Sequence, residues 1–177
     1  MLKTIILLSM LLGSISLSAY RYDSGQLYVS GGLGAHINVV RHEGKSPTPK
    51  AYMPFYGTLD YAIDRNFGVF ASFAPQFSGG VISFLSRAGI KYWFSFLETP
   101  YVPYVSLAIT PELVVPTSSA KNHINIGISP GIGINYFVMA HFLVGMHLNF
   151  NPTFAFIDGQ KQMELGVIGL FDVSFRI

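Results

Sequence analysis

Ionisable side chains occur at alternate positions within otherwise apolar stretches of this 177-residue chain. At the C-terminus, GLFDVSFRI, Asp172 and Arg176 alternate with Phe171 and Phe175. A period of two places alternate residues on opposite faces of a β-strand. The charged residues with this placement are Asp60, Arg87, Lys91, Glu112, Glu164, Asp172 and Arg176. Charges on a shielded face must be paired, so the sequence predicts either a sealing network of salt bridges or a gate on a narrow solute path.

Two histidines, His36 and His147, have the same inward placement and are candidates for acid–base chemistry. A histidine base needs a nucleophile within reach, but the residue two positions after His147 is Asn149. The five histidines are scattered without an H-x-x-x-H spacing, and the chain has no cysteine. These observations predict no metal site, no cofactor and no enzymatic activity.

The segment that must position such residues is clearest from Ile124 to Val138, INIGISPGIGINYFV. Its even-numbered residues are apolar and mostly large, whereas the odd-numbered ones are mainly Gly, Ser and Asn. A soluble β-sandwich would carry charged side chains on its outer face, but the side chains on this polar face are small and uncharged. The pattern is typical of a transmembrane barrel strand, with isoleucines toward lipid and small polar residues toward the lumen.

Seven further segments alternate in the same way. The eight expected strands cover residues 26–41, 52–63, 67–77, 81–94, 101–115, 124–138, 142–156 and 163–177. An even number of antiparallel strands closes without free edges, as lipid requires. The fold class is therefore predicted to be all-β, an eight-stranded antiparallel up-and-down transmembrane β-barrel. Six prolines fall inside these strands, and the pattern offers no explanation for Pro130, which lies mid-strand.

The N-terminal residues predict export. Lys3 precedes the apolar run Ile5–Leu12, and small residues follow up to Ala19. This is the pattern of a secretory signal peptide, which divides the chain into a signal peptide, 1–19, and a barrel domain, 20–177. The run is too short for a spanning helix. A formal net charge of +2 and the lack of a basic run argue against nucleic-acid binding.

The connections predict an orientation. Those after the second, fourth and sixth strands are taken as the tight ones, which would face the periplasm. Outward aromatic residues gather at that end, as expected for a headgroup belt: Tyr61, Phe67, Tyr92, Phe94, Tyr101, Tyr136, Phe142 and Phe175. The opposite loops carry Arg41, Lys45, Lys50, Lys121 and Lys161. These are either solvated loop charges or a basic rim that binds lipopolysaccharide phosphates.

Two hairpin segments, LDYAIDRNFGVFASF and GIGINYFVMAHFLVGMHLNF, resemble hairpins of the small OmpA, OmpX and OmpW barrels. The terminal alternation of Phe171, Val173, Phe175 and Ile177 resembles the signal read by the barrel-assembly machinery, which usually ends in Phe or Trp. The resemblance implies a Gram-negative-type outer membrane, with its lipid, lipopolysaccharide and assembly machinery as partners.

Four functions follow as hypotheses. The first is a structural, envelope-integrity role. The second is a narrow porin-like channel for small or hydrophobic solutes, as the OmpW resemblance implies. A lipid A-modifying enzyme is the third, although lipid A deacylases resembling PagL carry a His-x-Ser pair that is His-x-Asn at His147 here. A lipocalin-like binder is the fourth, but its apolar interior would invert the observed pattern.

Overall fold

The computed structural model describes residues 22–42, 48–95, 99–118, 121–157 and 160–177. The predicted signal peptide therefore lies outside the described residues. Within these ranges no helix has the length and hydropathy needed to cross a membrane.

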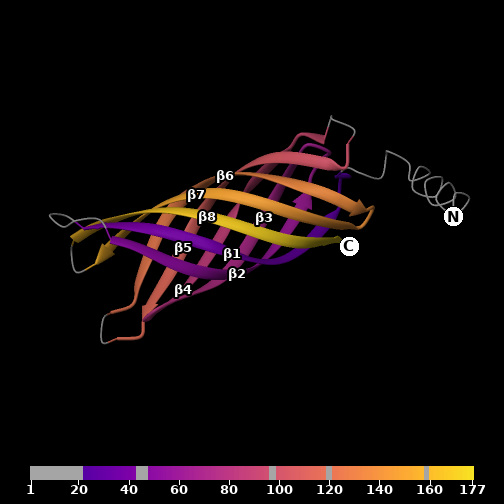
Figure 1. Ribbon diagram of the computed structural model, residues 1–177. Coiled ribbons are helices and arrows are strands. Elements are labelled where there is room, and N and C mark those ends of the chain that lie inside the picture. Colours follow the sequence, from indigo (N-terminus) through magenta and orange to yellow (C-terminus); the bar gives the residue numbers. More distant parts are fainter. Residues whose placement is uncertain (1–21, 43–47, 96–98, 119–120, 158–159) are drawn as a thin grey trace, which may run out of the picture.

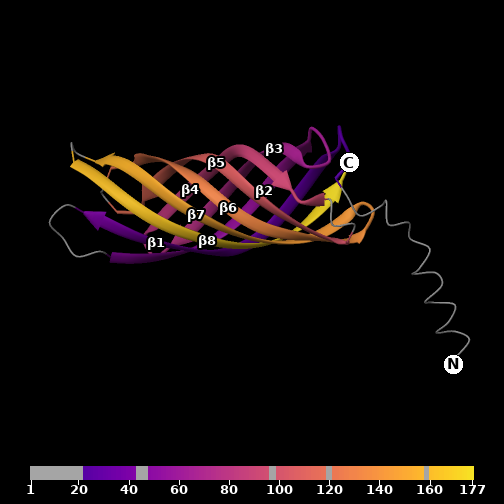
Figure 2. The same ribbon diagram turned by 90° about the horizontal axis from the view of Figure 1, so that it is seen from above.

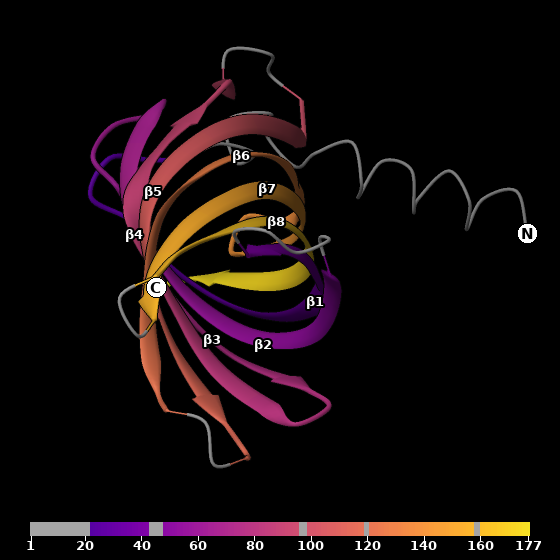
Figure 3. The same ribbon diagram turned by 90° about the vertical axis from the view of Figure 1, so that its left-hand side faces the viewer.

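Eight strands form one closed antiparallel barrel in sequence order, β1 pairing with both β2 and β8. Figures 1 and 2 show the long, tilted strands from the side, and Figure 3 shows the barrel turned so that one end faces the viewer. The strands are β1 (Leu27–His42), β2 (Thr48–Ala62), β3 (Phe67–Ser78), β4 (Val81–Trp93), β5 (Tyr101–Pro116), β6 (His123–Met139), β7 (Phe142–Ile157) and β8 (Gln160–Arg176). The predicted fold class is confirmed.

The two faces of the barrel wall have opposite chemistry. Large apolar side chains such as Ile109, Ile124 and Phe171 are exposed on the outer face. The inner face buries amides, hydroxyls, charged groups and a smaller number of aromatic and aliphatic side chains. This is the inverse of a water-soluble barrel, and it is the arrangement that a hydrocarbon environment stabilises.

The strand prolines coincide with interruptions of the hydrogen-bonded ladders. Between β6 and β7, described pairs stop at Gly127 opposite Thr153 and resume in the same register at Gly131 opposite Asn149. Pro130 falls inside that interval. Because proline has no N–H to donate, the strand loses pairing on one side there and keeps it on the other, where Pro130 lies opposite Leu107.

Four more prolines show the same relationship. Pro54 lies in an interruption between β1 and β2, Pro75 in one between β2 and β3, Pro111 in one between β4 and β5, and Pro152 in the β6–β7 interval. Pro103 instead lies near the start of β5, where its carbonyl accepts a hydrogen bond from the Phe94 amide. The prolines are thus accommodated without a change of register.

Some predicted boundaries are wrong. β2 begins at Thr48 and β8 at Gln160. Lys50 and Gln162 therefore lie within strands, although the sequence predicts loops at these two positions. Lys50 pairs with Asn38 in the β1–β2 ladder, and this pairing extends the strand through a segment rich in proline and charge. The β4 strand ends at Trp93, before Phe94. The β3–β4 connection, Gly79 and Gly80, is also a tight turn, so tightness does not separate the two ends of the barrel.

Candidate functional site in the barrel lumen

An aromatic cluster fills the lumen at the end where β1 begins and β8 ends. Its buried members are Tyr22, Tyr28, Ala62, Trp93, Val102, Tyr104, Phe137 and Leu143. Trp93 is fully buried and fits because Gly68 faces it: a Cβ on Gly68 would lie 2.4 Å from the indole ring. The cluster therefore fits in the lumen because a neighbouring strand carries a small residue where it faces the cluster.

Tyr22 is the centre of this cluster and comes from the segment before β1. Its ring stacks on Trp93 with centroids 4.1 Å apart, and the edge of Phe137 meets it at 5.6 Å. The amide of Asn135 donates a hydrogen bond to its hydroxyl. Burial raises the pKa of the Tyr22 phenol well above its usual range, so the hydroxyl is neutral. The segment thus places a neutral aromatic plug inside one mouth of the barrel.

Polar contacts hold this N-terminal segment at the barrel rim. The Gly25 amide donates to the Ala62 carbonyl at 2.8 Å, and Ser24 Oγ donates to the Ile63 carbonyl at 2.7 Å. Asp23 pairs with Arg176 Nη1 at 3.2 Å. The first expected strand begins at residue 26, so the alternating pattern does not predict this plug; the one signal for it in the sequence is an aromatic residue, Tyr22, among polar neighbours.

The mid-lumen holds a network of opposite charges. Lys91 Nζ lies 2.5 Å from Asp60 Oδ1, and His147 Nε2 lies 2.9 Å from Asp172 Oδ1. Arg87 Nε donates to Ser72 Oγ at 3.0 Å. The ammonium of Lys91 also lies over the Tyr104 ring, 5.1 Å from its centroid.

A cavity of about 10 Å³ lies among these groups, which is room for about one water. The mid-lumen is therefore closely packed as well as charged. The seven residues predicted as a network do not form a single cluster: Asp60, Arg87, Lys91 and Asp172 lie in the mid-lumen. Arg176 lies at the rim beside Asp23, and Glu112 and Glu164 belong to a separate group.

That separate group lies toward the opposite end of the lumen. Glu164 accepts hydrogen bonds from Asn38 at 2.8 Å and Gln162 at 2.7 Å, and Glu112 accepts one from Asn125 at 3.1 Å. His36 Nδ1 is hydrogen-bonded to Gln76 Oε1 at 2.6 Å. Among the described residues, no group of three or more His, Cys, Asp or Glu side chains could hold a metal ion.

The residues predicted as a basic rim are only partly described. Lys50 is half-buried within β2, and Lys121 is exposed beside β6. Lys45 lies outside the described residues, as do the side chains of Arg41 and Lys161. The predicted assembly-signal residues Phe171, Val173, Phe175 and Ile177 all have exposed side chains on or just after β8.

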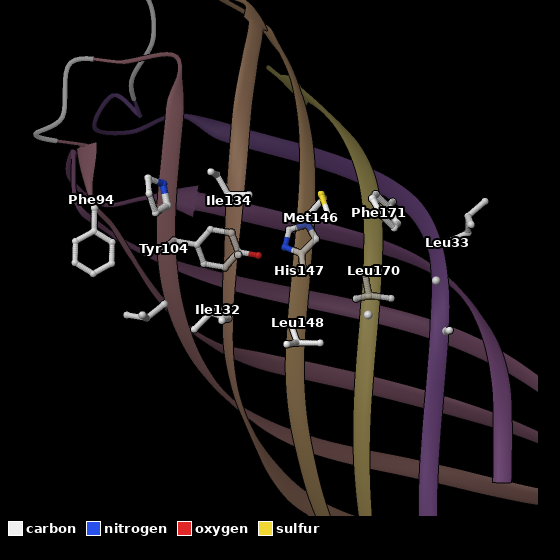
Figure 4. A pocket seen from close by; sticks show the side chains of 16 residues that line it. Leu33, Phe94, Tyr104, Ile132, Ile134, Met146, His147, Leu148, Leu170 and Phe171 are labelled. Carbon is white, nitrogen blue, oxygen red and sulfur yellow. The ribbon is translucent and has the colours of Figure 1, made fainter.

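An apolar hollow lies on the barrel wall across β5, β6, β7, β8 and β1. Figure 4 shows Ile132, Leu148 and Phe171 among the side chains that line it, together with Tyr104 and His147. The small residues Ala35 and Gly169 lie opposite each other on β1 and β8 and also line this hollow. The outer surface is therefore recessed where neighbouring strands carry small residues.

The closed barrel, the apolar exterior and the polar lumen define this chain as an eight-stranded β-barrel of the transmembrane type. No protein-family model matches its sequence, and no curated protein sequence matches it. Several solved structures share the fold, including three at 14% sequence identity. OprG from Pseudomonas aeruginosa matches with a TM-score of 0.65 over 89% of this chain and 98% of its own.

The N-terminal β-barrel domain of Pseudomonas aeruginosa OprF gives a TM-score of 0.61, over 88% of this chain and 100% of that domain. Neisserial surface protein A, NspA, gives 0.57, over 85% of this chain and 97% of its own. At 14% identity the likeness concerns the fold alone. It confirms the predicted resemblance in fold to small eight-stranded outer-membrane barrels.

Proposed function

We propose that this chain is an integral protein of a bacterial outer membrane whose barrel serves a structural, envelope-integrity role. The observation that carries the proposal is the obstruction of the lumen at two levels. Tyr22 and Trp93 fill one mouth, and the Lys91–Asp60 and His147–Asp172 pairs occupy the mid-lumen. A lumen this narrow is filled by its own side chains, and such a barrel stabilises its membrane without conducting.

The proposal includes the ends of the chain. Residues 1–19 act as a signal peptide, and cleavage near Ala19 leaves Tyr22 close to the new amino terminus. The alternating residues Phe171, Val173, Phe175 and Ile177 are read by the assembly machinery, and the basic rim binds lipopolysaccharide phosphates. The exposed apolar side chains along β8 support recognition by the assembly machinery. The barrel has no catalytic role in this proposal.

A narrow channel for small or hydrophobic solutes is the second candidate. The observation that favours it is the apolar hollow of Figure 4, which could receive a hydrophobic molecule from the lipid side. In that case the mid-lumen charges would gate a path instead of sealing it. The two candidates differ in whether the intact barrel conducts.

Single-channel recording of the refolded full chain in planar bilayers separates them. Wild type and Arg87→Ala are recorded alongside Tyr22→Ala and the control Tyr61→Ala, which truncates an exposed outer-face tyrosine. The sealed barrel predicts silence from wild type. Discrete wild-type openings that Arg87→Ala alters would overturn the sealed-lumen proposal and favour the channel. Fractionation of cells, with heat-modifiable mobility as a test of folding, checks the outer-membrane location.

A further inference from the structure

Two acidic side chains are buried in the half of the lumen farther from Tyr22. Glu112 on β5 is 1% exposed and Glu164 on β8 is 4% exposed. Both oxygens of Glu164 accept hydrogen bonds from side-chain amides, one from Asn38 and one from Gln162. Both Glu164 oxygens therefore act as hydrogen-bond acceptors toward these two amides.

The described part of the chain supplies neither carboxylate with an ion pair. Among the described residues, Lys91 pairs with Asp60 and Arg176 with Asp23, and the His147 imidazole lies beside Asp172. Glu112 and Glu164 lie close enough for their like charges to interact, whereas Lys50 attracts Glu164 without forming an ion pair. Burying two carboxylates without an ion pair to either is unfavourable.

Several register neighbours of these carboxylates carry buried oxygen atoms that have no partner in the described structure. Asn125 lies opposite Glu112 and donates its amide N–H to that carboxylate, yet its own Oδ1 is buried and unpartnered in the described structure. Thr153 lies opposite Glu164, and its hydroxyl is also buried and unpartnered. The same holds for the hydroxyl of Thr110, two residues before Glu112 on the same face. Asn125 is wholly buried, and Thr153 is 1% exposed.

We propose that a hard divalent cation, best matched by Ca²⁺, binds in the lumen between Glu112 and Glu164. The side-chain oxygens of Asn125, Thr153 and Thr110 complete its coordination together with water. Ca²⁺ takes six to eight oxygen ligands in flexible geometry, and two carboxylates balance its charge. The all-oxygen donor set disfavours metals that prefer imidazole or thiolate. Water alone would satisfy the free oxygens but would give neither carboxylate an ion partner.

Titration of Ca²⁺ into the refolded, EDTA-treated full chain in detergent tests the site by calorimetry. We expect one ion per chain. Glu112→Gln and Glu164→Gln should each weaken binding about tenfold or more, because affinity depends on the number of charged ligands. Asp172→Asn is the matched control: it removes the same charge from the separate mid-lumen network and should leave binding unchanged. Terbium, a luminescent substitute for Ca²⁺, should be sensitised by the neighbouring buried Tyr52.

Two results would overturn the site. One is a folded wild-type chain that binds no Ca²⁺ and shows the same thermal midpoint with and without it. The other is binding that persists in the folded Glu112→Gln/Glu164→Gln double variant. Heat-modifiable mobility and the β-sheet circular dichroism signal verify folding of each variant. The site does not depend on the structural role proposed above, since a conducting or a sealed barrel could hold the ion.

Discussion

Tyr22 stacks on Trp93 with the ring planes 15° apart, although one residue precedes the first strand and the other ends the fourth. The contact joins the N-terminal segment to the barrel interior. Trp93 N also donates to the Asn66 carbonyl, and the Asn66 side chain donates back to the Trp93 carbonyl at 2.7 Å. Trp93, on whose ring Tyr22 stacks, is therefore held in place by hydrogen bonds to the neighbouring turn.

Replacing Tyr22 by alanine tests this contact. Tyr22→Ala should lower the free energy of unfolding by about 3 kcal/mol, since a large aromatic side chain leaves a cavity behind. Tyr22→Phe keeps the ring stack and loses only the hydrogen bond from Asn135, so it should cost about 1 kcal/mol. Urea unfolding in lipid vesicles measures both. Equal effects of the two variants would contradict a role for the stacked ring.

The Lys91–Asp60 pair should behave as a buried ion pair. Lys91→Met leaves the Asp60 carboxylate buried without its partner, which should cost about 3 kcal/mol. The Asp60→Asn/Lys91→Met double variant removes both charges and should recover much of that loss. The Asp23–Arg176 pair is the control: it is partly exposed, and Asp23→Asn should cost less than about 1 kcal/mol. A double-mutant cycle with no coupling would contradict the prediction.

Gly68 should be far less tolerant of a side chain than Gly57. A Cβ on Gly68 would lie 2.4 Å from the Trp93 ring, whereas the nearest atom to a Cβ on Gly57 is 3.8 Å away. Gly68→Ala should therefore destabilise the barrel by about 2 kcal/mol through overpacking. Gly57→Ala should be neutral or slightly stabilising, because alanine loses less entropy than glycine in a strand. Equilibrium unfolding of the two variants under one condition checks the difference.

The strand pattern was predictable because lipid and lumen impose opposite chemistry on alternate residues. That rule correctly placed residues such as Ile109 outside and Glu112 inside. It could not find the Tyr22 plug, whose position depends on contacts with Trp93 and Phe137 far along the chain. Nor could it locate the start of β2, where pairing with β1 overrides the local preference of proline and charge for loop.

The same limit applies within the strands. Pro130 lacks an N–H donor toward only one of its two neighbouring strands. Which strand that is depends on the register, which the sequence does not give. The predicted lumen charges show the same dependence on register. Their inward direction follows from period two, but the separation of Glu112 and Glu164 from the Lys91–Asp60 pair depends on the register between strands.

Ile109, near the middle of β5, provides a test of the lipid-facing surface. It is 63% exposed on the outer face. Ile109→Lys should lower the free energy of unfolding in bilayers by about 3 kcal/mol, the cost of a lysine near the midplane, whereas a lysine near the interface costs about 0–1 kcal/mol. Met139, at the end of β6, is equally exposed and is the matched control. Met139→Lys should therefore have little effect. Equal losses from the two substitutions, measured by urea unfolding in vesicles, would show that depth in hydrocarbon does not determine the cost, and would contradict the lipid-facing assignment of this surface.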